Sequence, residues 1–306
     1  MLLIDKIKST AFSPAEQNVI DYLFNEKSDI ENMTIQELSE RTYVHPSTFI
    51  RIAKKLDYNG WIEFKNAFLK EQHYLSRHFE AIDPNLPFSR NDSSLKIAQK
   101  MALLKQKTIE DTYTILTHDQ LQQATKLLEQ AKKIRIFASN ANLILCHDFA
   151  LKMGHIKKDV QLSTIIGEQP YDAYHTDSST CSLLISYTGE NQLLTQLLPI
   201  LKKQGSKIIT LTSIGESTLA TKTDCHLPIT TRERLYSKIG NFTISTSIVY
   251  LLDVLYSNVF AKNYEENLQH LITLGEAFDK RTSTANVMNE PWPTPQPQVT
   301  DSFIPN

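Results

Sequence analysis

Apolar residues recur at helical spacing between residues 46 and 56, and polar residues fill the remaining positions. The spacing i, i+3, i+4, i+7 predicts a helix with one buried face. The opposite face is predicted to be exposed, and it has three cations, two hydroxyls and no acidic residue. The buried positions are Phe49, Ile52, Ala53 and Leu56, and the exposed ones are Ser47, Thr48, Arg51, Lys54 and Lys55.

A short helix is predicted immediately before this one. Thr34 and Glu37 have the spacing of a capping box, in which a hydroxyl and a carboxylate each bind a backbone amide at a helix start. The chain then turns within residues 41–44, and His45 and Pro46 occupy the cap and the first position of the next helix. A lone basic helix is most often a solvated surface helix. A capped helix, a tight turn and a basic helix in succession favour a helix-turn-helix, whose second helix lies in the major groove of DNA.

Four more helices and a linker are predicted in the first 130 residues. One helix begins at the capping box Ser13–Glu16, and another follows Gly60. Residues 78–94 are rich in Pro, Asn, Asp and Ser, which is the composition of a linker. Beyond it, the apolar spacing predicts a long helix over residues 95–116 and a further helix that begins at Thr117.

From residue 133 onward, short β-rich runs alternate with helical stretches. This alternation predicts βαβ units and a parallel sheet with helices on both faces. Ligands of such sheets bind at the carboxyl ends of the strands. The predicted strands are 134–137, 160–162, 181–185, 207–211 and 226–229, and the clearest helices between them are 143–153 and 191–203.

The fold class that follows is an all-α helix-turn-helix domain joined to an α/β domain. The end of the chain has five prolines in residues 289–306 and no apolar period, so we expect it to be disordered. The predicted parts are a DNA-binding domain at 1–77, a linker at 78–94, an α/β domain at 95–281 and a tail at 282–306.

Two loops follow predicted strands and are rich in groups that bind anions. Residues 186–191, Ser-Tyr-Thr-Gly-Glu-Asn, offer two hydroxyls, an amide side chain and a glycine that lets the backbone approach a ligand. Residues 138–142, Ala-Ser-Asn-Ala-Asn, have a similar character after the first strand. This combination suits a phosphate. Ser, Thr and Asn also cap helices where no ligand binds, but two such loops on one sheet favour a binding site.

Composition sets limits on the function. The chain has 306 residues and a net charge of −2, and residues 41–80 alone contain 7 Lys+Arg against 4 Asp+Glu. DNA contact is therefore expected from a local patch, with strong salt dependence. Three widely spaced cysteines in apolar surroundings favour a reducing compartment, and neither a signal-peptide layout nor an apolar run of about 18 residues is found. We expect a cytoplasmic protein without a membrane partner.

The first 80 residues resemble the N-terminal domain of the RpiR family of bacterial transcription regulators. The resemblance rests on FSPAEQNVIDYL and on TIQELSERTYVHPSTFIRIAKKLDYNGWIEFKNAFLKE, with His45 where the family usually has serine and Asp57 where it usually has glycine. It implies that the second helix of the motif binds operator DNA. The candidate DNA-binding residues are Thr34, His45, Ser47, Thr48, Arg51, Lys54, Lys55 and Lys65.

The second half resembles the sugar isomerase (SIS) domain, a three-layer sandwich that forms the effector-sensing half of RpiR regulators. The segment LLISYTGENQLLTQLLPILKKQGSKIITLTS is similar to its second phosphate loop and the following unit. By position, Ser186, Thr188 and Asn191 would bind the phosphate of a phosphosugar. The candidate effector-binding residues are Ser139, Asn140, Asn142, Ser186, Tyr187, Thr188, Gly189, Glu190, Asn191 and Lys238.

The combined prediction is a homodimeric or tetrameric transcription regulator that binds operator DNA and a phosphorylated sugar and governs genes of sugar uptake or catabolism. Neither a dinucleotide fingerprint, a P-loop, a CxxC nor an HExxH is present, so we expect no cofactor, no metal and no catalytic residue. The alternative is a phosphosugar isomerase with Glu190, His175 or Glu233 as its base. A DNA-binding head favours the regulator, since an isomerase would not need one. A constitutive DNA-binding architectural protein would leave the two anion loops unexplained.

Overall fold

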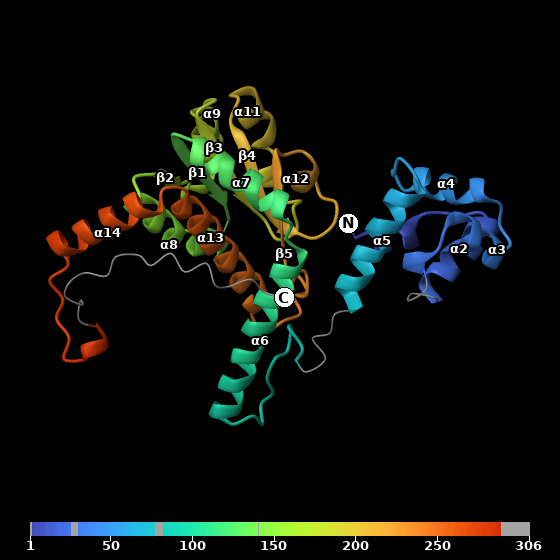
Figure 1. Cartoon of the computed structure of the whole chain (residues 1–306), viewed down its shortest axis with the longest axis horizontal. Helices are drawn as coiled ribbons and strands as arrows, with labels where there is room; N and C mark the ends of the chain where they lie inside the picture. Colours follow the sequence, from blue (N-terminus) through green and yellow to red (C-terminus); the bar gives the residue numbers. More distant parts are fainter. Residues whose placement is uncertain (1, 26–29, 77–81, 140, 289–306) are drawn as a thin grey trace.

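The computed structural model describes residues 2–25, 30–76, 82–139 and 141–288. Residues 2–76 form a helical head, and residues 82–288 form an α/β sandwich domain (Figure 1). The predicted fold class is therefore confirmed. Asn140, residues 77–81 of the predicted linker and residues 289–306 of the predicted tail lie outside the described residues.

The helices of the head begin where the sequence places their caps. Thr34 and Glu37 form a complete capping box, and His45 accepts a bond from the amide of Ser47 at 3.3 Å. The first helix was not predicted, because Glu71, from the far end of the head, caps it through the amides of Leu3 and Ile4. The elements of the head are α1 (Leu3–Ser9), α2 (Pro14–Asn25), the 3-10 turn η1 (Ile30–Asn32), α3 (Ile35–Thr42), α4 (Pro46–Lys55) and α5 (Trp61–Ser76).

An aromatic core fixes the angle between α4 and α5. The ring of Phe49 on α4 meets Trp61 on α5 edge-on, with 4.7 Å between centroids. Phe64 and Phe68 continue this contact along α5, and all four side chains are buried. The buried face that the spacing predicted for residues 49–56 therefore packs against α5, and the opposite face of α4 is directed outward.

The sandwich domain is built on five parallel strands in the order β2-β1-β3-β4-β5. β3 is buried along its whole length and lies at the centre of the sheet, as its unbroken apolar run predicted. The order reverses between β1 and β3, because the chain leaves β1 towards β2 and returns on the other side. The strands are β1 (Lys133–Ala138), β2 (Asp159–Leu162), β3 (Thr180–Ile185), β4 (Lys207–Ser213) and β5 (Cys225–Ile229).

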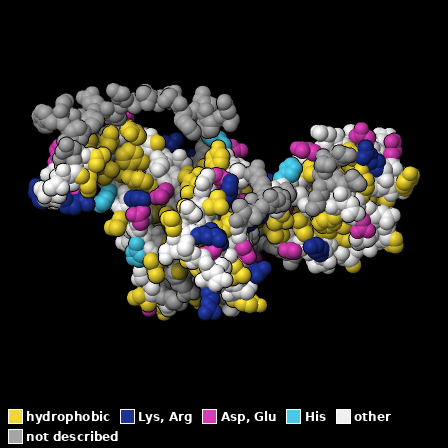
Figure 2. All heavy atoms as spheres, turned by 90° about the horizontal axis from the view of Figure 1, so that it is seen from below, with side chains coloured by type: hydrophobic (Ala, Val, Ile, Leu, Met, Phe, Trp, Pro, Cys, Tyr) yellow, Lys and Arg dark blue, Asp and Glu magenta, His cyan; other side chains and the backbone are white. Residues whose placement is uncertain are grey.

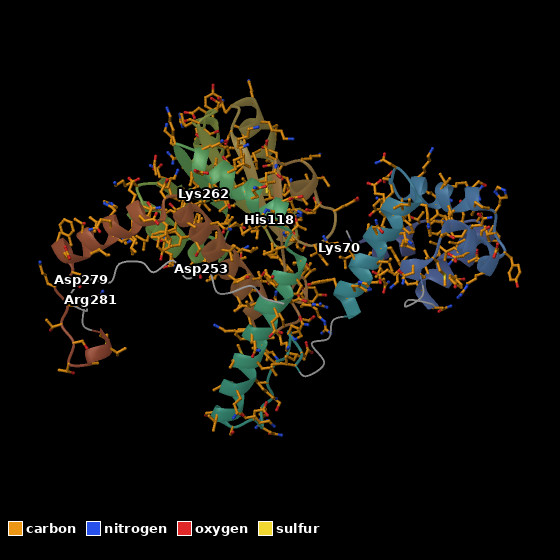
Figure 3. The ribbon with its side chains drawn as sticks, in the orientation of Figure 1. Lys70, His118, Asp253, Lys262, Asp279 and Arg281 are labelled. Atoms are coloured by element: carbon orange, nitrogen blue, oxygen red, sulfur yellow. The ribbon has the colours of Figure 1, made fainter. Side chains whose placement is uncertain are left out.

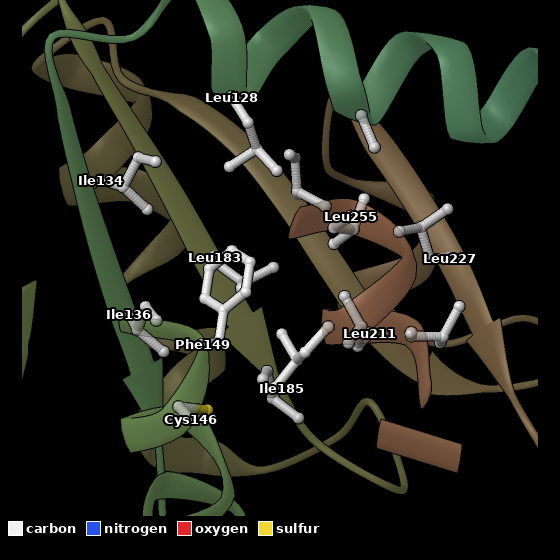
Figure 4. Packing of buried hydrophobic residues seen from close by; sticks show 14 of the residues in the cluster. Leu128, Ile134, Ile136, Cys146, Phe149, Leu183, Ile185, Leu211, Leu227 and Leu255 are labelled. Atoms are coloured by element: carbon white, nitrogen blue, oxygen red, sulfur yellow. The ribbon is translucent and has the colours of Figure 1, made fainter. Parts of the chain in front are cut away.

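Helices cover both faces of the sheet. On one face, leucines and a phenylalanine from α7, α8 and α13 pack over the strands (Figure 4). On the other face, α9 to α12 pack around Leu184 and Ile208. These helices are α6 (Ser94–Ile115), α7 (His118–Gln130), α8 (Ala141–His155), α9 (Gln169–Tyr174, after the 3-10 turn Ile166–Glu168), α10 (Gln192–Thr195), α11 (Leu198–Lys203), α12 (Thr218–Thr221) and α13 (Phe242–Lys262).

Two helices differ from expectation. The helix predicted over 191–203 is split into α10 and α11, because Pro199 lacks the amide that would continue it. α13 reaches a mean hydropathy of 1.4 over 18 residues, so by length and composition it could cross a membrane. In the fold, however, Leu251, Leu255 and six other residues of α13 are buried.

The chain ends in α14 (Tyr264–Phe278) and the 3-10 turn Asn286–Met288. α14 extends away from the sandwich, and none of its residues is buried (Figure 1). The described part of the predicted linker is packed against the protein, unlike α14. Its buried residues are Ile82, Pro84, Asn85 and Pro87. Asn85 donates to the carbonyl of Arg232 and accepts from the amide of Arg234, so this segment is fixed on the sandwich domain.

Candidate functional site

The outward face of α4 has a mixed composition in the structure. Ser47, Arg51, Lys54 and Lys55 are exposed as expected, but Thr48 is buried and its predicted exposure was wrong. Thr48 lies at the edge of the apolar stripe, where packing against neighbouring helices decides burial. His45, the cap of α4, is exposed, and its Nδ1 lies 2.9 Å from Ser47 Oγ.

Two cations of α4 are held by one buried carboxylate. Arg51 Nε donates to Glu16 Oε1 at 2.8 Å, and Lys55 Nζ donates to Glu16 Oε2 at 2.9 Å. Burial raises the pKa of Glu16, but bonds from Ser13, Lys55 and Arg51 outweigh this effect and lower the pKa to about 2. The carboxylate is therefore charged at neutral pH and orients both cations, while Arg51 keeps 58% of its side chain exposed. This pairing could not be predicted from the sequence, because Glu16 also fits a capping box.

Two other predicted DNA contacts serve the head itself. Lys65 Nζ donates to the carbonyls of Ile30, Glu31 and Met33 at 3.0–3.4 Å, so all three of its protons are engaged. Lys65 therefore fixes the turn before α3, and its contact with DNA stays a prediction. Thr34 is exposed and caps α3 through its bonds with Glu37, which leaves it at the edge of the candidate surface.

One exposed residue beside α4 was missed. Tyr43, in the turn between α3 and α4, is 95% exposed and has a left-handed backbone with φ of 54°. Such a conformation is unfavourable for a tyrosine and is usually taken by glycine. The structure keeps a large aromatic ring in solvent at the tip of the helix-turn-helix. The sequence signal for this residue was a tight turn without a glycine, since such a turn leaves another residue to adopt the left-handed conformation. Asp57 shows the same feature at φ of 67°.

The two anion loops meet at the reversal of strand order. Ala138 pairs with Ile185 at the ends of β1 and β3, so the loops that follow begin side by side. Asn191 Nδ2 donates to Ser139 Oγ at 3.2 Å, which joins the two loops directly. The crevice outside such a reversal is the usual ligand site of open α/β sheets.

The second loop, residues 186–191, is a tight turn. Ser186 Oγ accepts from the amide of Gly189, and Thr188 Oγ1 accepts from the amide of Glu190, each at 3.2 Å. Gly189 has φ of 67° and no room for a side chain, because an added Cβ would lie 2.0 Å from Ser217 Oγ. Asn191 accepts from two amides at the start of α10. The loop therefore gathers hydroxyls and amides over a few ångströms.

Other predicted effector residues have partners within the protein. Glu190 accepts from the amide and hydroxyl of Thr218, both at 2.7 Å, and these bonds lower its pKa. Lys238 Nζ lies 3.0 Å from Glu233 Oε2 and 5.6 Å from the ring centre of Tyr187. Asn142 is half-buried in the first turn of α8.

The residues considered as an isomerase base are poorly placed for that role. His175 follows α9 and precedes β3, at the edge of the sheet opposite the two loops. Glu233 is buried and caps α13 by accepting from the amide and hydroxyl of Thr243 and from the amide of Ile244. Glu190 is held by Thr218, as described above. Among the described residues, His, Cys, Asp and Glu form no group of three that could hold a metal ion.

Comparisons with known proteins agree with this division. Residues 1–73 match the model of the helix-turn-helix domain of the rpiR family, and residues 127–257 match that of the SIS domain. The chain is 22% identical over 281 residues to an uncharacterized HTH-type transcriptional regulator of Caldanaerobacter subterraneus subsp. tengcongensis, covering 92% of this chain and 98% of that one. It is 24% identical over 283 residues to another such regulator, of Clostridium perfringens, covering 91% and 99%.

Two solved structures share the fold. One is the Vibrio vulnificus NanR protein complexed with ManNAc-6P, with a TM-score of 0.55 and 19% identity, covering 90% of this chain and 97% of that one. The other is the sugar isomerase domain of an RpiR transcription factor from Sphaerobacter thermophilus, with a TM-score of 0.52 and 12% identity, covering 58% and 98%. The first likeness extends over both the head and the sandwich domain.

Proposed function

We propose that this chain, a member of the RpiR family of helix-turn-helix regulators, controls transcription in response to a phosphorylated sugar. The head binds operator DNA through α4, and the sandwich domain binds the sugar phosphate at the joined loops. The bond between Asn191 and Ser139 carries this proposal, because it brings two polar loops together at the reversal of the sheet. The controlled genes would serve sugar uptake or catabolism, as the family resemblance implies.

The ligand class follows from the chemistry of the loops. The hydroxyl hydrogens of Ser186 and Thr188 are donors that suit a phosphate, and the amides of Gly189 and Glu190 hold these hydroxyls in place by donating to their oxygens. ManNAc-6P, which is bound by the NanR protein, is a first compound to test. We further propose that the protein acts in the cytoplasm as a homodimer or tetramer, since operators are usually paired half-sites.

Replacing Thr188 by alanine is expected to weaken binding of the sugar phosphate roughly ten- to a hundredfold, because a hydrogen bond to a charged group contributes about 1.5–3 kcal/mol. Thr188 is exposed, so the fold should be retained. Calorimetry on wild type, Thr188→Ala and the control Thr195→Ala, whose side chain lies outside the loop, measures the change. Wild-type affinity in Thr188→Ala would remove its hydroxyl from the site.

Replacing Arg51 by alanine is expected to reduce operator affinity by about 1–3 kcal/mol and to affect scrambled DNA less, as a base contact would. Lys54→Ala should weaken binding to operator and to scrambled DNA alike, as a phosphate contact would. It should also lower the slope of log affinity against log salt concentration by about 1. Gel shifts can use a site selected from random DNA by the full-length protein, with Lys8→Ala as a control on α1. Unchanged affinity in both α4 variants would exclude α4 from the interface.

Tyr43→Gly is expected to increase stability by about 1 kcal/mol, because glycine adopts positive φ without strain, and to reduce operator affinity at the same time. Lys157→Gly is the matched control, since Lys157 also has positive φ, at 63°, but lies in the sandwich domain. It should gain stability and bind DNA as wild type does. Urea unfolding and gel shifts measure both quantities. A Tyr43→Gly variant with unchanged DNA affinity would show that this ring does not contact DNA.

A further inference from the structure

The second anion loop contacts a segment that leads towards the head. Tyr187, between Ser186 and Thr188, donates its hydroxyl hydrogen to the carbonyl oxygen of Glu233 at 2.7 Å. The same hydroxyl oxygen accepts from the amide of Glu233 at 3.2 Å. The backbone at residue 233 is therefore tied to a side chain of the loop on which the phosphate site is proposed.

The residue before Glu233 forms a buried cluster with the head. Arg232 pairs with Asp111 of α6 at 2.8 Å and donates to the backbone carbonyl of Tyr74 in α5 at 2.6 Å. Its guanidinium also lies over the ring of Tyr74, 4.1 Å from the centre. Only 11% of the Arg232 side chain and 5% of the Asp111 side chain are exposed.

Tyr74 completes this cluster from the side of the head. Its hydroxyl accepts from the amide of Thr231 at 2.7 Å and lies 3.4 Å from Thr230 Oγ1. Thr230 in turn donates to Asp111. Burial, with a contribution from Asp111, raises the pKa of Tyr74 to about 12, so the hydroxyl stays protonated at neutral pH. One side chain of the head therefore contacts three consecutive residues, 230–232, at the end of β5.

The surrounding contact between head and sandwich is incompletely packed. Lys6 of α1 reaches Glu216 at 3.2 Å across an exposed gap. A cavity of about 580 Å³ lies beside it, lined by Tyr74, by Lys70 on α5 and by Gly215 among others. Lys70 is labelled in Figure 3. Figure 2 shows the head as a separate lobe beside the sandwich domain. Incompletely packed contacts between domains permit relative motion, so a few specific bonds can determine the position of the head.

We propose that Tyr187, Arg232, Asp111 and Tyr74 form a joint through which occupancy of the phosphate loop sets the position of the head. This inference rests on the proposed function, and it names the route of regulation. A ligand held by Ser186 and Thr188 constrains the loop on both sides of Tyr187. Tyr187 is bonded to residue 233, and residues 230–232 are bonded to Tyr74. The intact joint is therefore more compatible with one of the two states of the loop, ligand-bound or ligand-free, than with the other. This difference is what a ligand needs in order to shift an equilibrium.

Tyr74→Phe tests the joint, since it removes the hydroxyl and keeps the ring under Arg232. The measured quantity is the ratio of operator dissociation constants with and without saturating ManNAc-6P. In Tyr74→Phe this ratio should fall to within twofold of 1, while affinity for ManNAc-6P and for operator, each measured alone, stays within about threefold of wild type. Tyr113→Phe, on the 61%-exposed Tyr113 of α6, should keep the wild-type ratio. A wild-type ratio in Tyr74→Phe would overturn the proposal.

A second measurement separates failure of the joint from failure of the proposed function. Amide hydrogen exchange of Thr231, whose N–H is donated to Tyr74, can be followed in the full chain without ligand and with inorganic phosphate. Tyr74→Phe should speed this exchange at least tenfold without ligand, and Tyr113→Phe should not. Unchanged exchange in Tyr74→Phe would overturn the joint. The wild type could bind neither sugar phosphate nor inorganic phosphate, while Tyr74→Phe still exchanges the Thr231 amide tenfold faster than wild type. This result would refute the proposed effector and leave the head contact established.

Discussion

Gly189→Ala is expected to destabilise the sandwich domain by about 2–4 kcal/mol and to abolish binding of the sugar phosphate. Gly189 has φ of 67°, which any L side chain disfavours, and an alanine Cβ would lie 2.0 Å from Ser217 Oγ and 2.6 Å from Ser217 Cβ. The loop and the segment before α12 cannot both keep their positions. Urea unfolding and calorimetry with ManNAc-6P measure the two losses.

Two further variants make this result specific. Gly154→Ala, on α8, should be neutral or slightly stabilising, because nothing lies within 4 Å of its added Cβ and alanine favours a helix. Gly189→Ala/Ser217→Gly should recover part of the stability by removing the clashing atoms, while the cost of positive φ remains. Wild-type stability and affinity in Gly189→Ala would contradict the tight turn described for this loop.

Asp111→Ala is expected to destabilise the protein by about 3–5 kcal/mol, because it leaves the buried guanidinium of Arg232 without its carboxylate. The pair is 2.8 Å apart, and both side chains are nearly excluded from solvent. Asp253→Ala is the more accessible counterpart (Figure 3), since Asp253 lies 2.7 Å from a half-buried Lys152 and keeps 49% of its side chain exposed. It should cost at most about 1 kcal/mol. Urea unfolding compares the two, and a loss below about 1 kcal/mol in Asp111→Ala would mean that the cluster is open in solution.

Local features of the fold could be predicted from the sequence. The capping boxes at Thr34 and Thr117 form as expected, because their partners lie three residues away. The buried face of α4 follows from spacing alone. The position of the two anion loops follows from the rule that parallel strands end at one edge, and the structure places Ser139 and Asn191 in contact there.

Features that depend on distant residues could not be predicted. Glu16 is 35 residues from Arg51, so its role in orienting that cation appears only when α2 packs against α4. Lys65 was predicted to contact DNA, yet its ammonium group donates to backbone carbonyls in the turn at residues 30–33. Glu190 likewise lies in the second anion loop but is held by Thr218, 28 residues away. In each case a charged side chain suggested a ligand, and tertiary contacts within the chain determined its partner.

The coupling of sugar phosphate to DNA depends first on whether the loops at Ser139 and Ser186 bind a phosphate. Calorimetry on the wild-type chain with a panel of sugar phosphates, ManNAc-6P first, and with each corresponding free sugar tests this directly. We predict that at least one sugar phosphate binds at least a hundredfold more tightly than its free sugar, in line with several charge-assisted hydrogen bonds. Equal affinity for a sugar and its phosphate, or no binding across the panel, would contradict the account.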